Sequence, residues 1–286
     1  MKIRAHETFC IRKGWLHKGV KNILINPRIF TNKDINPSDS LGIGTSMVKS
    51  LRYWLTAVGI MEEVSEGSHK IQQLTKLGCL IDEYDKFYEE DGTNWIIHYK
   101  LASNEQLATA WYWFFNEFNF TTFNKSVFVN EFFEFLQTTY NYSGSIKMLE
   151  DEFDCIIKTY CIKDKEVGPE ETNECPLIEL KLIEDCGNKE YRKISPDKNA
   201  IHPMVLFAVI CDKYEREEIL IADLMDDINS VGKIFNLDRS TLFYILEQLQ
   251  KMNLIEISRT AGLDVIKTKK RMNFYDALKE YYKLIN

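Results

Sequence analysis

The chain lacks the sequence features of membrane proteins, secreted proteins and several common enzyme classes. Its 286 residues contain no run of about 18 apolar residues, so no transmembrane helix is expected. The first eight residues have no apolar stretch of the kind found in secretory signals. The nucleophile-elbow, P-loop and zinc-protease motifs (G-x-S-x-G, G-x-x-x-x-G-K-[ST] and H-E-x-x-H) are also absent. None of these signatures therefore assigns a function.

The seven cysteines form no C-x-x-C pair, which argues against a structural zinc site. Their number is odd and several lie in apolar runs, as in a protein whose thiols stay reduced in the cytoplasm. The hydrophobic fraction of 45% and the charged fraction of 28% are ordinary for a globular chain of this length. We therefore expect a cytoplasmic protein of two or three domains.

The formal net charge is −7, but it is unevenly distributed along the chain. Residues 1–80 hold 12 basic and 6 acidic residues, a net charge of +6. Residues 81–200 hold 12 and 24, a net of −12, and residues 201–286 hold 12 and 13, a net of −1. The basic beginning favours a polyanionic partner for that part of the chain. The acidic middle can repel DNA, face another protein or simply form a solvated surface.

The pattern over residues 41–81 predicts a winged helix-turn-helix. A helix follows a glycine-containing turn, with apolar residues at helical spacing at Met47, Leu51, Trp54, Leu55 and Val58. Strands are predicted at residues 60–64 and 69–74, joined by a turn, and a closing helix at residues 75–81. The polar side of the first helix holds no acidic residue, as a helix that lies against DNA requires.

The remaining chain is predicted to be mainly helical and to end in a second module of the same kind. Helices are expected near residues 95–101, 104–118, 126–139 and 148–160, and aromatic density there indicates a buried core. Residues 163–175 look like a loop, and residues 175–183 like a strand or a short helix. Further helices, at 203–212, 230–235, 239–252 and 275–284, accompany strands at 253–258 and 264–268, and residues 219–225 lead into the second of these helices. The predicted class is mainly α (α+β), with winged-helix domains at 1–82 and 201–286 and a helical, acidic middle domain at 83–200.

Two segments carry side chains suited to phosphodiester chemistry. His6 and Glu7 are a candidate general base and its orienting or metal-binding carboxylate. The alternative is structural, because a glutamate near a helix start is favourable through the helix dipole. The second segment, Glu179-Leu-Lys181, resembles the E-x-K part of a nuclease core. It needs a further acidic residue, for which Asp164, Glu170 and Glu171 are candidates, and such a tripeptide also arises by chance.

Basic, hydroxyl and aromatic side chains of both modules are candidate DNA contacts. Lys49 and Arg52 are expected to hold backbone phosphates, and the hydroxyl groups beside them to reach base edges. The full set of predicted contacts is Arg12, Lys13, Thr45, Ser46, Lys49, Arg52, Tyr53, Lys70, Arg239, Thr241 and Tyr244.

Four blocks of sequence resemble the family catalogued as domain of unknown function 4007. They are His6-Glu-Thr-Phe9 with Arg12 and Trp15-Leu-His-Lys-Gly19; Leu41-Gly-Ile-Gly44 with Met47-Val-Lys-Ser50 and Arg52-Tyr-Trp54; Leu101-Ala-Ser-Asn104 with Trp111-Tyr-Trp113 and Phe115-Asn116; and Cys175-Pro-Leu177 with Glu179-Leu180 and Leu182-Ile183. Ala5 stands where the family pattern has glycine, and Lys181 where it has a small residue. The second departure weighs against the E-x-K interpretation.

The family is similar to SspB, a component of bacterial systems that place sulfur in the backbone of one DNA strand. The resemblance implies partnership with a cysteine desulfurase, an ATPase and an ATP-pyrophosphatase-like protein, and a DNA-nicking activity. Cleavage of a phosphodiester would use Mg²⁺ or Mn²⁺ to polarise the phosphate and activate water. We therefore expect a DNA-binding component of a phosphorothioation and defence system that is a metal-dependent nicking endonuclease acting on double-stranded DNA, with no membrane partner. The alternatives are a non-catalytic DNA-binding adaptor and a winged-helix transcriptional regulator.

Overall fold

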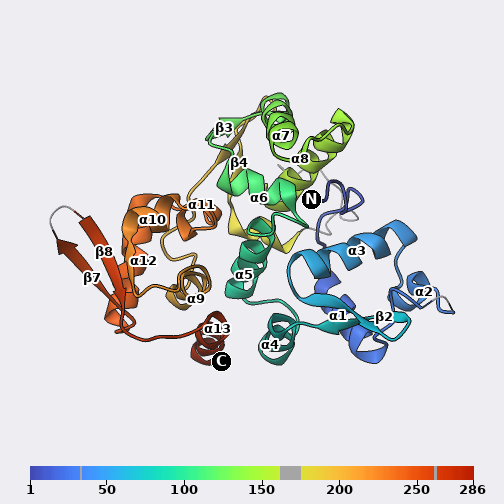
Figure 1. Cartoon of the computed structure of the whole chain (residues 1–286), viewed down its shortest axis with the longest axis horizontal. Coiled ribbons are helices and arrows are strands. Elements are labelled where there is room, and N and C mark those ends of the chain that lie inside the picture. Colours follow the sequence, from blue (N-terminus) through green and yellow to red (C-terminus); the bar gives the residue numbers. More distant parts are fainter. Residues whose placement is uncertain (33, 162–174, 261–262) are drawn as a thin grey trace.

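The computed structural model describes residues 1–32, 34–161, 175–260 and 263–286 (Figure 1). The first block contains helices α1 (Trp15–Ile25), α2 (Pro37–Leu41) and α3 (Thr45–Ala57), then the antiparallel hairpin β1 (Met61–Glu66) and β2 (His69–Leu74), and finally α4 (Lys76–Tyr84). The order of helix, hairpin and helix predicted over residues 45–81 is therefore confirmed. Gly59 has a φ of +70°, which lets the chain turn from α3 into the hairpin. The domain boundary predicted at residue 82 falls in the last turn of α4.

The middle block is built around helices α5 (Asp91–Ala102), α6 (Thr109–Asn116), α7 (Lys125–Tyr140) and α8 (Ile146–Tyr160). The aromatic residues of α6 are buried, so the expectation of a core rather than an exposed stacking surface is confirmed. A short 3-10 helix, η2 (Pro176–Leu180), leads into β4 (Ile183–Asp185). A small antiparallel sheet in the order β3-β5-β4 joins this strand to β3 (Thr122–Phe123) and β5 (Tyr191–Lys193).

The third block contains the four helices that the sequence predicts, which are α9 (Pro203–Lys213), α11 (Val231–Ile234), α12 (Arg239–Lys251) and α13 (Phe274–Ile285). It also contains α10 (Ile221–Asp226), which the sequence did not indicate. Asp238 caps α12, accepting a hydrogen bond from the Thr241 amide at 2.8 Å. Strands β7 (Ile255–Thr260) and β8 (Leu263–Thr268) pair as expected, and β6 (Glu218–Leu220) adds a third strand in the order β6-β8-β7. The mixed, helix-rich α+β class is therefore confirmed.

Helix α13 ties the end of the described chain to its earlier parts. It packs on α9 and also contacts α4, beside which it lies in Figure 1. The ring of Tyr282 stacks on Tyr84, with centroids 5.4 Å apart, and its hydroxyl lies 2.7 Å from the hydroxyl of Thr93 in α5. Buried residues of all three blocks form a continuous hydrophobic core. Among the described residues, no helix combines the length and apolarity needed to cross a membrane.

The close approach of α4 to the chain just before the hairpin makes Gly78 a sensitive position. A Cβ placed there would overlap the backbone carbonyl of Ile60, which cannot move independently of β1. Gly78→Ala is therefore expected to lower the free energy of unfolding by about 1–3 kcal/mol, although alanine favours helix. Urea denaturation measures this loss. Gly19→Ala is the control, because the three atoms nearest to its Cβ belong to the side chain of Leu55, whose end can shift more easily than backbone. An equal loss in both variants would contradict the explanation.

Candidate nucleic-acid interface

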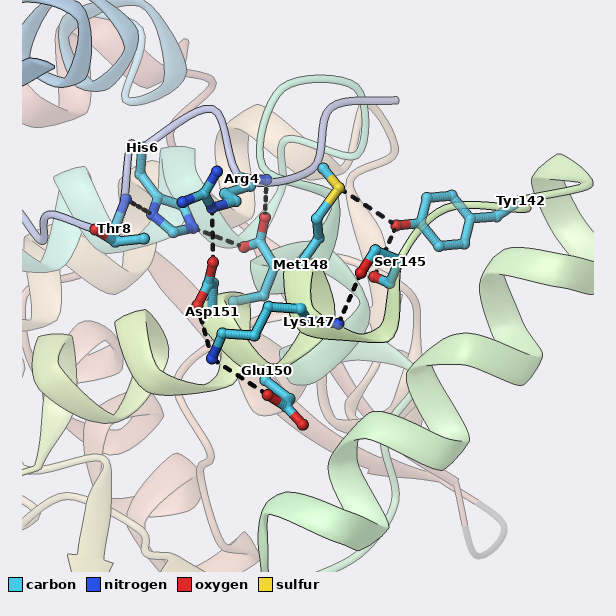
Figure 2. A network of polar contacts seen from close by, with 10 residues as sticks. Arg4, His6, Thr8, Tyr142, Ser145, Lys147, Met148, Glu150 and Asp151 are labelled. Carbon is cyan, nitrogen blue, oxygen red and sulfur yellow. Dashed lines mark hydrogen bonds and ion pairs between the residues drawn. The ribbon is translucent and has the colours of Figure 1, made fainter.

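His6 lies entirely inside the protein, where the N-terminal segment crosses α3, α6 and α8. Its ring stacks on Trp54, with centroids 6.0 Å apart and planes at 17°, and meets the Trp111 ring edge-on. Nδ1 accepts a hydrogen bond from the Thr8 amide at 3.1 Å, and Nε2 lies 3.2 Å from the Glu152 carboxylate (Figure 2). Because Nδ1 accepts a hydrogen bond, we assign the ring proton to Nε2. Both ring nitrogens therefore face groups of the protein itself.

Glu152 fastens the N-terminal segment to α8. One of its carboxylate oxygens faces His6, and the other accepts a hydrogen bond from the Arg4 backbone amide. The guanidinium of Arg4 lies outside this contact and pairs with Asp151 at 2.6 Å, as Figure 2 shows. Glu7 follows in a tight turn with a φ of +51° and is half-buried. This arrangement gives His6 an anchoring position, and a catalytic role for His6 and Glu7 stays a prediction.

A basic pocket lies between the beginnings of α1 and α3. Its cavity of about 470 Å³ is lined by Arg12, Lys13, Gly14, Trp15, Lys18, Gly42, Ile43, Gly44 and Met47. Both helices have glycine at the N-cap, so the N-cap residue has no side chain that can accept a hydrogen bond from the first backbone amides. The Lys18 ammonium donates to the Leu41 carbonyl at 3.1 Å and is held in place.

The chemistry of this pocket suits an anion. Within the described chain, its lining has three cationic side chains and no carboxylate. The positive ends of two helix dipoles add to those charges. Arg12 lies over the rings of Phe9 and Trp15, at 5.6 and 5.4 Å, so its guanidinium is oriented before a ligand arrives. The arrangement can hold a phosphate of a nucleic acid backbone.

Helix α3 presents some of the predicted DNA contacts to solvent and turns others inward. Thr45, Ser46 and Lys49 are exposed on its first half, next to the basic pocket, and Lys70 is exposed on the hairpin. Arg52 instead pairs with Glu63 of β1 at 2.5 Å. The hydroxyl of Tyr53 donates to the Leu107 carbonyl at 3.0 Å, which places this side chain against the middle block rather than toward a base edge.

The predicted contacts of the C-terminal module are engaged within the protein. Arg239 forms an ion pair with Asp264 at 3.2 Å. Thr241 is buried at the start of α12, and the hydroxyl of Tyr244 donates to the Asn199 side chain at 2.9 Å. These residues are not brought together with the basic pocket of the first block.

The E-x-K tripeptide does not lie on a strand. Glu179 belongs to η2, and Lys181 follows it with a φ of +51°. Asp164, Glu170 and Glu171, its candidate partners, lie outside the described residues. Within residues 1–32, 34–161, 175–260 and 263–286, no three His, Cys, Asp or Glu side chains are grouped so that they can hold a metal ion. The expected Mg²⁺ or Mn²⁺ site therefore stays a prediction.

A second cavity, which sequence patterns did not indicate, adjoins the basic pocket. It measures about 440 Å³, and Arg12, Lys13 and Gly14 line both cavities. Its other walls come from the first turn of α1, from the loop after α4, from Asn94 of α5 and from η2. The available signal was the pair Phe87 and Tyr88 inside an otherwise acidic and polar segment.

Comparisons with known proteins agree on the fold and the family. No curated protein matches the chain. Two solved structures, described as magnesium ion-bound SspB and as SspB, superpose with a TM-score of 0.86 at 24% identity, covering 99% of this chain and 88% of theirs. At this identity, the similarity is one of fold. The family model described as a protein of unknown function (DUF4007) matches residues 3–282, and the chain therefore belongs to the DUF4007 family.

Proposed function

We propose that this protein binds DNA through the basic pocket and the exposed first half of α3. The observation that carries the proposal is the pocket itself, where Arg12, Lys13 and Lys18 surround two uncapped helix beginnings. Thr45, Ser46 and Lys49 continue this surface along α3. In this proposal the first block acts as a winged helix, with α3 as the recognition helix and β1–β2 as the wing.

The proposed setting is a DNA phosphorothioation system. The resemblance of the sequence to the SspB-like family implies this setting, and family membership and the SspB-like fold support it. The proposed protein partners are a cysteine desulfurase, an ATPase and an ATP-pyrophosphatase-like protein. The acidic middle block offers them a surface opposite in charge to the DNA-binding block.

Magnesium-dependent nicking is the second candidate function, and the magnesium ion described for one solved neighbour favours testing it. The buried position of His6 favours an adaptor that binds DNA without cutting it. A supercoiled plasmid incubated with the protein and Mg²⁺, Mn²⁺ or EDTA separates the two. Metal-dependent open-circle product supports a nickase, whereas an intact plasmid that is shifted in a gel supports the adaptor.

The binding proposal predicts a salt-dependent loss in the double variant Lys13→Ala/Lys49→Ala. Each lysine that contacts a phosphate contributes about 0.9 to the slope of log affinity against log salt, so the slope should fall by about 1.8. Fluorescence anisotropy with a 20-bp duplex between roughly 50 and 200 mM salt measures it. Lys251→Ala/Lys279→Ala removes two exposed lysines from α12 and α13 and is the charge-matched control. Equal slopes in both double variants would exclude this surface from the DNA interface.

A further inference from the structure

The cavity beside the basic pocket has buried polar groups that the described chain leaves without partners. Asn94 is 3% exposed, and its side-chain oxygen accepts no hydrogen bond from any described residue. The hydroxyl of Tyr88, which also lines the cavity, is buried and unpaired within the same described ranges. Buried polar atoms in folded proteins are normally hydrogen-bonded. The Asn94 oxygen thus has an unused capacity to accept a hydrogen bond, and the Tyr88 hydroxyl can donate or accept one.

The rim of this cavity carries an exposed aromatic ring. The side chain of Phe87 is 61% exposed, and its ring lies 4.9 Å from the ring of His17 on α1. Nδ1 of His17 is 3.0 Å from the carbonyl of Lys86, and this contact joins α1 to the loop that follows α4. An exposed phenylalanine fixed beside a cavity offers a flat surface on which a planar ligand can stack.

The loop that carries Phe87 is held in shape from within. The carboxylate of Asp85 accepts hydrogen bonds from the backbone amides of Glu89 and Glu90, at 2.9 and 3.1 Å. Tyr88 adopts a φ of +60°, which is uncommon for a residue other than glycine. Residues kept in sparsely populated backbone conformations cluster at ligand-binding sites. The loop is thus preorganised for contact with a ligand.

The two neighbouring cavities differ in charge, although Arg12, Lys13 and Gly14 line both of them. The basic pocket has three cations and suits a phosphate. The second cavity also has Glu89 and Glu179 in its lining, which disfavours a phosphate and offers acceptors for amino groups. A nucleotide combines these two chemistries. Its phosphate is an anion that suits the basic pocket, and its base is a planar group whose amino substituent can donate hydrogen bonds in the second cavity.

We propose that the second cavity receives an unpaired, amino-bearing base of bound DNA, while the phosphate of the same strand lies in the basic pocket. This inference rests on the proposed DNA binding. The base stacks on Phe87 and donates hydrogen bonds to the Asn94 oxygen at the floor. The cavity volume, about 440 Å³, falls in the range of small-ligand sites. A base enters such a cavity by leaving the helical stack or from a single-stranded region.

Three 20-bp duplexes test the proposal by fluorescence anisotropy: one fully paired, one with a single unpaired adenine, and one with an abasic unit at that position. The duplex with the unpaired adenine is expected to bind about 10-fold more tightly than the abasic duplex, because stacking contributes at this scale. Phe87→Ala should remove most of this preference. Phe120→Ala, which truncates another exposed phenylalanine, should keep it.

Asn94→Leu tests the floor of the cavity separately. It keeps the branched shape of the side chain and removes the unpaired oxygen, so the preference for adenine should fall. A preference unchanged by both Phe87→Ala and Asn94→Leu overturns the proposal. Binding of dAMP alone, with no preference among the duplexes, overturns it in favour of a free nucleotide. Failure to bind any duplex removes the proposed DNA binding as well, whereas tight binding without a preference removes only the base site.

Discussion

Glu152→Ala is expected to lower the free energy of unfolding by about 3–5 kcal/mol, because it removes one partner of a buried polar pair. The side chain is 3% exposed and serves both the His6 ring and the Arg4 amide. Alanine would leave the buried His6 ring without its ionic partner beside a new cavity, and the part-buried Arg4 amide without its acceptor. Urea denaturation followed by circular dichroism measures the loss.

Asp151→Ala is the matched control for this prediction. Asp151 is the preceding residue on α8, but it pairs with the exposed side chains of Arg4 and Lys147. Its removal should cost no more than about 1 kcal/mol. Similar losses in the two variants would contradict the anchoring role of Glu152.

The anchoring position of His6 also affects nuclease assays. A His6→Ala protein that loses nicking activity must first be shown to retain its fold, because the substitution removes a buried contact as well as a candidate catalytic group.

Acid is expected to destabilise the protein by about 3 kcal/mol through His98 alone. His98 is fully buried, where Nδ1 lies 2.7 Å from the Tyr160 hydroxyl and Nε2 lies 2.8 Å from the Ile234 carbonyl. Burial lowers its pKa from 6.5 to about 4. Between these values the unfolded chain binds the proton more readily, so the stability present above pH 6.5 is lost as the pH falls toward 4. Each pH unit in this window costs about 1.4 kcal/mol.

Urea unfolding at pH 7, 6, 5 and 4 tests this prediction. Carboxylates also contribute to acid sensitivity, so the informative quantity is the difference between the native chain and a variant. His98→Gln should be less stable at pH 7 but should lose less on acidification. His17→Gln is the control substitution at a partly exposed histidine. Parallel curves for the native and His98→Gln proteins would show that His98 does not titrate in this window.

The sequence predicted the helices well because their apolar spacing is a local property. The stripe on α3 is buried as expected from Leu51 to Val58, although Val48 replaces Met47 as its first buried residue. Strands β3, β4, β5 and β6 have two or three residues each, which is too short for an alternating pattern to be recognised.

The site was less predictable because it depends on contacts between distant segments. Tyr53 lies off the apolar stripe in sequence, yet its hydroxyl reaches Leu107 of the middle block. Arg52 on α3 pairs with Glu63 on β1, and this contact exists only when β1 has packed against α3. Asn94 lies in the first turn of α5, and nothing in the local sequence indicates that its oxygen would be left unpaired in a cavity that Arg12 also lines. Propensity and periodicity do not contain such information.

The packing of α13 on α9 has a consequence for synthesis of the chain on the ribosome. Residues Pro203–Lys213 emerge well before Phe274–Ile285, and α4 emerges earlier still. The apolar faces of α9 and α4 that contact α13 therefore stay exposed to solvent until α13 has been synthesised. Nascent chains with exposed apolar surface are prone to aggregation and are substrates for chaperones. A nonsense mutation that stops translation just before residue 274 would leave these faces permanently open, and its product should be cleared by proteolysis.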